Sequence, residues 1–341
     1  MTVLASRAIE IAATLLEKSG LTTENAQTSA RAIVVSDVWG IPSHGLMRLS
    51  FYLDRIAHGG INPKARMIEL ASGPGFARYE GEAGLGHWQL NKLAEVSAEL
   101  AQNAGIAIAT VKNSSHCGAL GVYVFPALDK NLVSIIFSNG PAAMPAIGGK
   151  YPILSTSPLA AGIPSNPVPT VVDLATSAVA RGKIATAAQK GESIPEGWAF
   201  DEFGEPTTDP KIALKGMLAP LGGSKGFTIS LLIENLASGL AGGVPSSEVP
   251  DMFNSAQDAL GQQISHTIIT INPAAISGPE AYQAMDQIAA NVTASGGRIP
   301  GAQRVNPRAL PEKEIKLPDG VRRELHRAAS SLGLGELIDE F

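Results

Sequence analysis

The sequence predicts an α/β fold with a helical N-terminal region, on the basis of three observations. Apolar residues recur at helical spacing through the first 60 residues. Beyond them, short apolar runs alternate with helical segments, and polar loops follow several of these runs. The chain has 341 residues, which is enough to bury a core without disulfides or structural metals. We therefore expect strands and helices to form α/β units behind the N-terminal helices.

Composition narrows the functional classes. Hydrophobic residues make up 45% of the chain and charged residues 17%, so we expect another subunit to cover part of the exterior. The formal net charge of −5 does not fit the basic surface that nucleic-acid binding requires. Cys117 is the single cysteine, which excludes an internal disulfide and a multi-thiolate zinc site and favours a cytoplasmic protein.

The apolar stretches do not suggest targeting or membrane insertion. Arg7 and Glu10 interrupt the apolar core that a signal peptide would need. The most apolar later stretch, residues 227–244, carries Glu234 and Asn235 near its centre, which is typical of a buried helix. We predict no membrane segment.

The elements can be placed in order along the chain. Helical spacing predicts helices over residues 8–16 and 26–38, and a third helix that begins at Ser43 as its N-cap. Strands are expected over residues 67–70, 77–79, 106–111, 132–137, 171–173 and 267–272, and further helices over 88–103, 175–190, 227–244, 281–294 and 320–332, with another ending at 128. Residues 139–169 are rich in Gly and Pro and should form turns and extended pieces.

His44 and Arg48 are the first candidates for chemistry. At a spacing of four residues in a helix they would share one face. An imidazole can transfer a proton near neutral pH, and a guanidinium binds a carboxylate through two parallel hydrogen bonds. Together they would form a receptor for a small carboxylate with a proton donor beside it. The alternative is that Ser43 only caps the helix and that both side chains lie on its solvated face.

His116 is the second candidate, because it follows an apolar strand in a loop of small residues that would let a ligand approach the backbone. The alternative is a loop histidine that bonds to a nearby turn. Cys117 as a nucleophile activated by His116 is disfavoured, because adjacent residues in an extended loop point to opposite sides.

The loop Gly222-Gly223-Ser224-Lys225-Gly226 precedes an apolar helix, where free N–H groups and one lysine would suit a phosphate. The spacing is not that of a Walker motif, and the Gly-x-Gly-x-x-Gly fingerprint of a Rossmann domain is absent. The other histidines, His58, His87, His266 and His326, stand singly in the sequence, and we interpret them as structural, with no metal implied.

Several motifs in sequence resemble the malate/L-lactate dehydrogenase family, which is unrelated to the Rossmann enzymes of similar name. The first is Ser43-His44-Gly45 followed by Arg48 and Tyr52. The others follow in order: Asn113-Ser114-Ser115-His116-Cys117-Gly118, Ser138-Asn139-Gly140-Pro141, Asp173-Leu174-Ala175-Thr176-Ser177, Ala180-Arg181-Gly182-Lys183, Pro195-Glu196-Gly197-Trp198, Pro220 to Gly226 and Ile299-Pro300-Gly301.

The resemblance implies an NAD(P)H-dependent reductase, usually a homodimer, with a non-Rossmann fold of the sulfolactate/malate dehydrogenase type and a mixed sheet flanked by helices. It implies that residues 1–65 pack with the segment 275–341, and that residues 66–274 form the cofactor-binding α/β region. By similarity, His44 would be the proton donor, Ser43 would orient it, and Arg48, Thr156 and His116 would face the substrate. The cofactor contacts implied are His116, Cys117, Gly118, Ala119, Leu120, Asp173, Leu174, Ala175, Ser224, Lys225, Arg298, Pro300, Gly301 and Arg304. NADPH is expected over NADH, because Arg298 and Arg304 could meet a 2′-phosphate.

The substrate implied is a small 2-oxo or cyclic 2-imino carboxylate. Two positions depart from the family pattern. Ser157 stands where many members have asparagine, and Lys183 stands where the cyclic-imine reductases have an aspartate that assists the Ser-His pair. Three alternatives stay open: a dehydrogenase that works in the oxidative direction, a catalytically silent ligand-binding member of the fold, and an acyl-transfer enzyme that uses Cys117.

Overall fold

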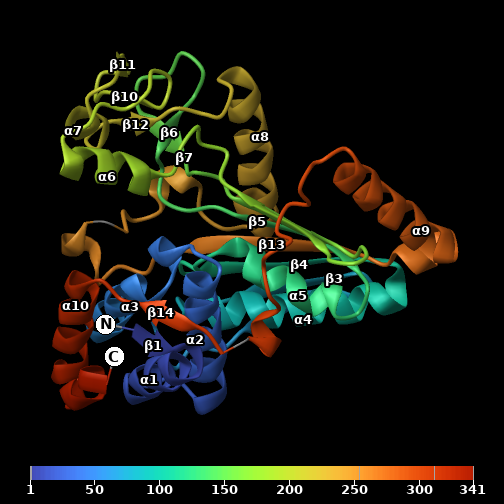
Figure 1. Cartoon of the computed structure of the whole chain (residues 1–341), viewed down its shortest axis with the longest axis horizontal. Coiled ribbons are helices and arrows are strands. Elements are labelled where there is room, and N and C mark those ends of the chain that lie inside the picture. Colours follow the sequence, from blue (N-terminus) through green and yellow to red (C-terminus); the bar gives the residue numbers. More distant parts are fainter. Residues whose placement is uncertain (1, 253, 311, 341) are drawn as a thin grey trace.

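A seven-stranded mixed sheet forms the centre of the molecule (Figure 1). The computed structural model describes the chain except for residues 1, 253, 311 and 341. The helices are α1 Ala5–Lys18, α2 Thr23–Val38, α3 Leu49–Ala57, α4 Gly86–Ala104, α5 Phe125–Leu128, α6 Arg181–Lys190, α7 Pro210–Ala213, α8 Ser224–Glu234, α9 Pro273–Ala294 and α10 Asp319–Ser331. The strands are β1 Thr2–Leu4, β2 Ile68–Gly73, β3 Phe76–Glu80, β4 Ile106–Ser114, β5 Val133–Ser138, β6 Met144–Pro145, β7 Pro152–Leu154, β8 Leu159–Ile163, β9 Thr170–Leu174, β10 Ala199–Phe200, β11 Pro206–Thr207, β12 Met217–Leu218, β13 Ile264–Ile271 and β14 Glu314–Lys316.

The strand order in the large sheet is β2-β3-β4-β13-β5-β8-β9. Strands β3 and β4 are parallel, and every other neighbouring pair is antiparallel. A Rossmann sheet is parallel throughout its nucleotide-binding part, so this topology agrees with the missing glycine fingerprint. The expected α/β class with a mixed sheet is confirmed.

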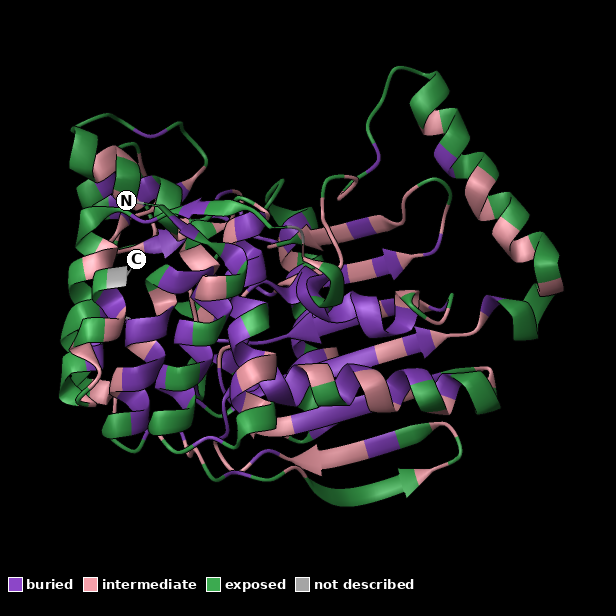
Figure 2. Ribbon diagram, turned by 60° about the horizontal axis from the view of Figure 1, so that its bottom comes forward, coloured by how far each residue is buried: buried purple, intermediate pink, exposed green. Residues whose placement is uncertain are grey.

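Helices α1, α2, α3 and α10 lie together at one side of the sheet, next to both ends of the chain (Figure 1). Their apolar faces share one buried cluster, which also includes Ile315 and Leu317 from β14 and the segment after it. Strand β1 pairs with β14 in an antiparallel register. Val305 and Leu310, which precede β14, also pack against this cluster. The C-terminal residues that pack on the N-terminal helices therefore begin at about Val305, whereas α9 projects away from the opposite end of the sheet (Figure 2).

A small unit of short strands, β6, β7 and β10 to β12, lies with α6 and α7 beyond one edge of the large sheet (Figure 1). It has its own apolar cluster, centred on Met144, Ile184 and Leu218. The Gly- and Pro-rich sequence predicts turns and extended pieces over part of this unit, but it does not predict β8 or the short strands.

Two expectations about helices are wrong. The third helix does not begin at Ser43: two single 3₁₀ turns, Pro42–His44 and Leu46–Arg48, come first, and α3 starts at Leu49. Gly45 between the turns has φ −94° and ψ −147°, which breaks the helical path. The stretch over residues 227–244 is helical as expected, but it is not buried within one chain, because Ile229, Leu232 and Leu240 are 47%, 59% and 49% exposed.

Candidate active site

The segment Ser43-His44-Gly45 is held between α2 and the turn that leads into α3. Asp37, near the end of α2, accepts a hydrogen bond from the Leu46 N–H at 2.7 Å. From the other side, the Arg48 Nε donates to the Ser43 carbonyl at 3.0 Å. These two contacts place His44 and Arg48 next to one another without the shared α-helical face that the spacing predicted.

The His44 imidazole is oriented by its neighbour. Its Nδ1 lies 3.0 Å from the Ser43 hydroxyl. Burial, together with the charge of Arg48, lowers the pKa of His44 to about 4. The ring is therefore neutral near pH 7 in the free protein, and an anion that neutralised Arg48 would raise this pKa.

His116 lies directly beside His44, as the loop after β4 brings it across from α3. The two rings stack with centroids 5.7 Å apart. The His116 Nδ1 lies 2.7 Å from the Tyr52 hydroxyl, and its backbone N–H donates to the Gln262 side chain at 3.0 Å. The two histidines singled out from the sequence are thus in one place.

His87 and His266 do not stand apart from the site, although their sequence positions suggested that they would. Both are buried, and both lie close enough to His116 to contribute to the lowering of its pKa. The His87 ring packs edge to face on Tyr52 at 4.8 Å, and the His266 Nε2 donates to the Ser115 carbonyl at 3.2 Å. Burial lowers the pKa of His87 to about 3 and that of His266 to about 4, so both are neutral. Their sequence spacing gave no indication of this cluster, because it forms from β4, β13 and α4.

Cys117 is a poor candidate for a nucleophile. The residue is buried, and burial raises the pKa of its thiol, with a further contribution from Asp173. A thiolate is the reactive form, so this environment opposes the acyl-transfer alternative.

The segments expected to contact a cofactor lie along β9. Gly121, which follows Leu120, lies against Asp173, since a Cβ placed there would come within 2.9 Å of the Asp173 carboxylate. The Pro300 carbonyl accepts a hydrogen bond from the Val171 N–H at 2.9 Å. Gly301 also packs closely on Val171.

The helix α8 begins next to the end of β9. The Leu221 N–H donates to the Thr176 carbonyl at 2.8 Å, and the Thr176 N–H donates to the Thr156 carbonyl at 2.9 Å. Thr156, Ala175 and Ser224 therefore belong to adjoining segments. Ser157 is buried with φ of 41°, and its hydroxyl turns back to the Ser155 carbonyl.

This arrangement fits an extended anionic ligand. Gly222 and Gly223 have positive φ values of 61° and 64°, and a Cβ atom added to either residue would have no described neighbour within 4 Å, so the start of α8 is open. Ser224 and Lys225 are exposed there. Helix N–H groups and a lysine at such an opening suit a phosphate.

Arg304 has a partner within the protein. Its guanidinium lies 3.2 Å from the Asp173 carboxylate and 5.0 Å from the Trp39 ring centroid. Burial raises the pKa of Asp173, while Arg304 lowers it. Arg298, in contrast, is exposed in the loop after α9.

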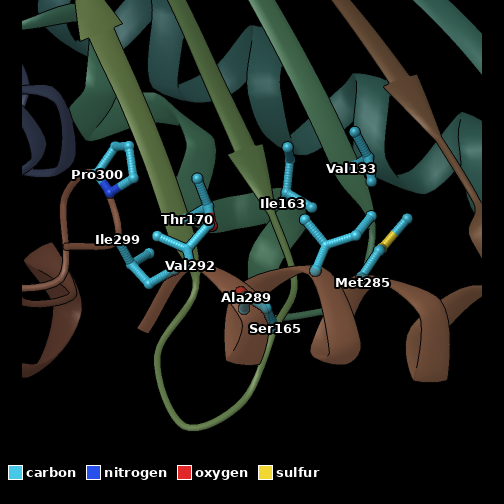
Figure 3. Close-up of a pocket in the computed structure, with 10 residues that line it drawn as sticks. Val133, Ile163, Ser165, Thr170, Met285, Ala289, Val292, Ile299 and Pro300 are labelled. Carbon is cyan, nitrogen blue, oxygen red and sulfur yellow. The ribbon is translucent and has the colours of Figure 1, made fainter. Parts of the chain in front are cut away.

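A cavity of about 400 Å³ lies elsewhere, between α9 and the ends of β5, β8 and β9 (Figure 3). Its lining is mostly apolar: Val133, Ile163, Ser165, Thr170, Met285, Ile288, Ala289, Val292, Ile299 and Pro300. None of the histidines lines it, so it does not belong to the candidate reaction centre. Among the described residues there is no cluster of three potential metal ligands and no helix long and apolar enough to cross a membrane.

Comparison with known proteins identifies the family. The family model described as malate/L-lactate dehydrogenase matches residues 3–326. The chain belongs to the malate/L-lactate dehydrogenase family. It is thus an NAD(P)-dependent oxidoreductase, as the motifs predicted.

Relatives within the family act on different carboxylates. The (2R)-3-sulfolactate dehydrogenase (NADP(+)) of Chromohalobacter salexigens is 34% identical over 325 residues, which cover 94% of this chain and 96% of the relative. The Δ1-pyrroline-2-carboxylate/Δ1-piperideine-2-carboxylate reductase of Pseudomonas putida is 33% identical over 278 residues, covering 81% of each. The solved structure of sulfolactate dehydrogenase from Methanocaldococcus jannaschii superposes with a TM-score of 0.91 at 30% identity and covers 100% of this chain and 99% of that chain. The sulfolactate/malate dehydrogenase-like fold is confirmed.

Proposed function

We propose that the protein reduces a small 2-oxo carboxylate, with a cyclic 2-imino carboxylate as the second candidate, and that His44 supplies the proton. The observation that carries this proposal is the stacked His44–His116 pair beside Arg48. His116 begins the loop of residues 116–121, whose Gly121 lies against Asp173 on β9.

The side chains divide the work. Arg48 would hold the substrate carboxylate, which fixes the adjacent carbon next to the histidines. A nicotinamide cofactor held by the segments along β9 would, when bound, supply a hydride for the reduction of that carbon. The negative charge that develops on the substrate oxygen or nitrogen calls for a proton, and His44 is the group that can donate it. Ser43 bonds to the Nδ1 and so keeps the Nε2 edge of the ring for the substrate.

The low pKa of His44 makes proton donation depend on the substrate. Arg48 is one of the causes of the lowered pKa. A substrate carboxylate on Arg48 would offset that charge, so the protonated imidazole becomes more stable when substrate is bound. In the reverse direction, neutral His44 is ready to accept the proton of a 2-hydroxy acid.

For the cofactor, we propose NADPH ahead of NADH, bound by the segments along β9 and by Ser224 and Lys225. The ion pair with Asp173 gives Arg304 a role in holding β9 to the loop of residues 298–304. The preference for a 2′-phosphate therefore rests chiefly on the exposed Arg298.

We also propose a homodimer. Apolar side chains are exposed on α8 and on α9, where Leu232 and Ile288 are 59% and 65% exposed. A second copy that covered these helices would bury them, in agreement with the low charged content of the chain.

The proposal is tested by following nicotinamide absorbance with NADPH and NADH against a panel of 2-oxo acids, including 3-sulfopyruvate and oxaloacetate, and the two cyclic imines. We expect turnover of one class, and a loss of about 10²- to 10⁴-fold in kcat for His44→Gln with unchanged cofactor affinity. Lys183 is exposed in the single chain, and it stands where the imine reductases have an aspartate that assists the Ser-His pair. We therefore expect oxo acids to be better substrates than cyclic imines. Cofactor binding without turnover of any compound would favour the silent ligand-binding alternative.

A further inference from the structure

The Nδ1 atom of His116 receives two hydrogen bonds. The Tyr52 hydroxyl lies 2.7 Å from it, and the Gly118 N–H donates to it over a long 3.4 Å. A backbone N–H can only donate, so this nitrogen presents its lone pair. The tyrosine hydroxyl must then be a donor as well.

Tyr52 is built to remain a donor. It is buried in α3, with its ring packed edge to face on His87 and on Phe51 at 5.5 Å. Burial raises the pKa of the Tyr52 hydroxyl further above its ordinary value, although Arg48 acts in the opposite direction. The hydroxyl therefore keeps its proton at every pH at which the enzyme would work.

His116 itself is neutral. Burial lowers the pKa of its ring well below the ordinary value, and His44, His87, Arg48 and His266 add to the effect. A neutral imidazole carries one proton, and when Nδ1 accepts, that proton is on Nε2. Within the described part of the chain Nε2 has no hydrogen-bond partner, and the residue is partly exposed.

We propose that Tyr52 is a positioning residue that fixes His116 as the Nε2–H tautomer, so that His116 is a neutral hydrogen-bond donor to the substrate beside His44. This inference rests on the proposed function for the identity of the ligand, a small carboxylate with an adjacent C=O or C=N group. It assigns the two stacked histidines different tasks: His44 transfers the proton, and His116 donates a hydrogen bond without giving up its proton.

The geometry also excludes His116 as the general base in this tautomer. Its outward nitrogen already carries a hydrogen, and its inward lone pair is used by Tyr52 and Gly118. The Gln262 contact to the His116 backbone holds the residue in this orientation from the β13 side.

The experiment uses the 341-residue chain labelled with ¹⁵N in its six histidines. Long-range ¹H–¹⁵N spectra distinguish protonated from unprotonated ring nitrogens, and the His116→Gln variant assigns the signals of His116. We expect the wild-type protein at pH 7.5, without ligands, to show His116 entirely as the Nε2–H form. In Tyr52→Phe, which keeps the ring and removes only the donor, we expect the Nδ1–H form to become populated.

Kinetics supply the second readout. Tyr52→Phe should lower kcat about tenfold, the value of one hydrogen bond of about 1.4 kcal/mol, with the dissociation constant of the cofactor unchanged. The matched control is Tyr282→Phe, which removes a hydroxyl that bonds to the Asn131 carbonyl near α9. It should change neither the spectrum of His116 nor kcat.

The inference is overturned if wild-type His116 is in the Nδ1–H form or positively charged, or if Tyr52→Phe leaves its tautomer and kcat unchanged. The wild-type spectrum needs no turnover, and its assignment needs only that the His116→Gln variant folds. If no oxo acid or imine is reduced while His116 shows the expected tautomer, the proposed function fails and the assignment of the tautomer stands.

Discussion

The carboxylate of Asp37 occupies the space in which a side chain at Gly45 would begin. A Cβ built on Gly45 would lie 2.2 Å from Oδ2 and 2.3 Å from Cγ of Asp37. The same carboxylate accepts the Leu46 N–H, so the turn after His44 is closed onto α2 by direct contact. The glycine of the Ser-His-Gly motif is therefore explained by its contact with Asp37.

Gly45→Ala should test this contact. The methyl group must displace Asp37 or the turn, and we expect a loss of about 1–3 kcal/mol in the free energy of unfolding together with a lower kcat. Urea unfolding and steady-state kinetics measure both. Gly182→Ala is the control, because nothing lies within 4 Å of its Cβ direction. Wild-type stability and kcat in Gly45→Ala would show that the turn can move without cost.

The ionisation of Asp37 should be visible in the pH dependence of stability. Burial raises the pKa of this carboxyl to about 7, while the Leu46 N–H acts in the opposite direction. The folded-state pKa is above the unfolded value of about 3.9, so the stabilisation is complete below pH 4 and is lost as pH rises through 7.

Asp37→Asn keeps an oxygen for the Leu46 N–H and cannot ionise. We expect its free energy of unfolding to increase relative to that of the wild type between pH 5 and 8. Glu24→Gln, on the exposed start of the same helix, should track the wild type throughout. Parallel curves for wild type and Asp37→Asn would mean that Asp37 has an ordinary pKa.

Burial of the ring and, after it, the charge of Arg48 should set the pH at which the activity of His44 titrates. With a pKa of about 4 in the free protein, kcat/KM for reduction should fall as pH rises above 4, whereas kcat/KM for oxidation should fall only below it. Arg48→Met removes the positive charge, so the pH dependence of kcat/KM in both directions should shift to higher pH. The variant should also bind substrate more weakly. Arg48→Lys should leave this pH dependence in place, although it loses the bidentate contact. If the pH dependence of kcat/KM were unchanged in Arg48→Met, the charge of Arg48 would have no effect on the pKa of His44.

Arg298 and Arg304 should have different effects on cofactor choice. Arg298→Gln should lower the efficiency with NADPH about tenfold more than that with NADH, as expected for the loss of a charge-assisted hydrogen bond of about 1.5 kcal/mol or more. Arg304→Gln leaves the partly buried Asp173 without its ion pair, so it should weaken both cofactors alike and lower the melting temperature. If the ratio of the NADPH to the NADH efficiency changed in Arg304→Gln and not in Arg298→Gln, Arg304 and not Arg298 would determine the cofactor preference.

Much of the fold could be predicted from the sequence, because local patterns determine it. Helices α1 and α2 and strands β4 and β5 followed their apolar periodicity to within a few residues. The short strands β10 to β12 had no such pattern, because each is only two residues long and depends on its neighbours in space.

The candidate site shows the same division. His44 could be singled out by its four-residue spacing to Arg48, and His116 by its loop of small residues after an apolar strand. Asp37, Tyr52 and His87 could not, since their importance comes from contacts between α2, α3, α4 and the loop after β4. The exposure of α8 could not be predicted for another reason. An apolar helix sequence does not distinguish a helix buried within its own chain from one that another subunit would cover.

The position of β13 has a consequence for how the protein is made. This strand, residues 264–271, lies between β4 and β5, which are more than 120 residues earlier in the chain. Until the ribosome has released it, β4 and β5 each present an open edge in what will become the middle of the sheet. The two halves of the sheet can then join only near the end of synthesis, so nascent chains that stop short of Ile264 should depend on chaperones to avoid aggregation.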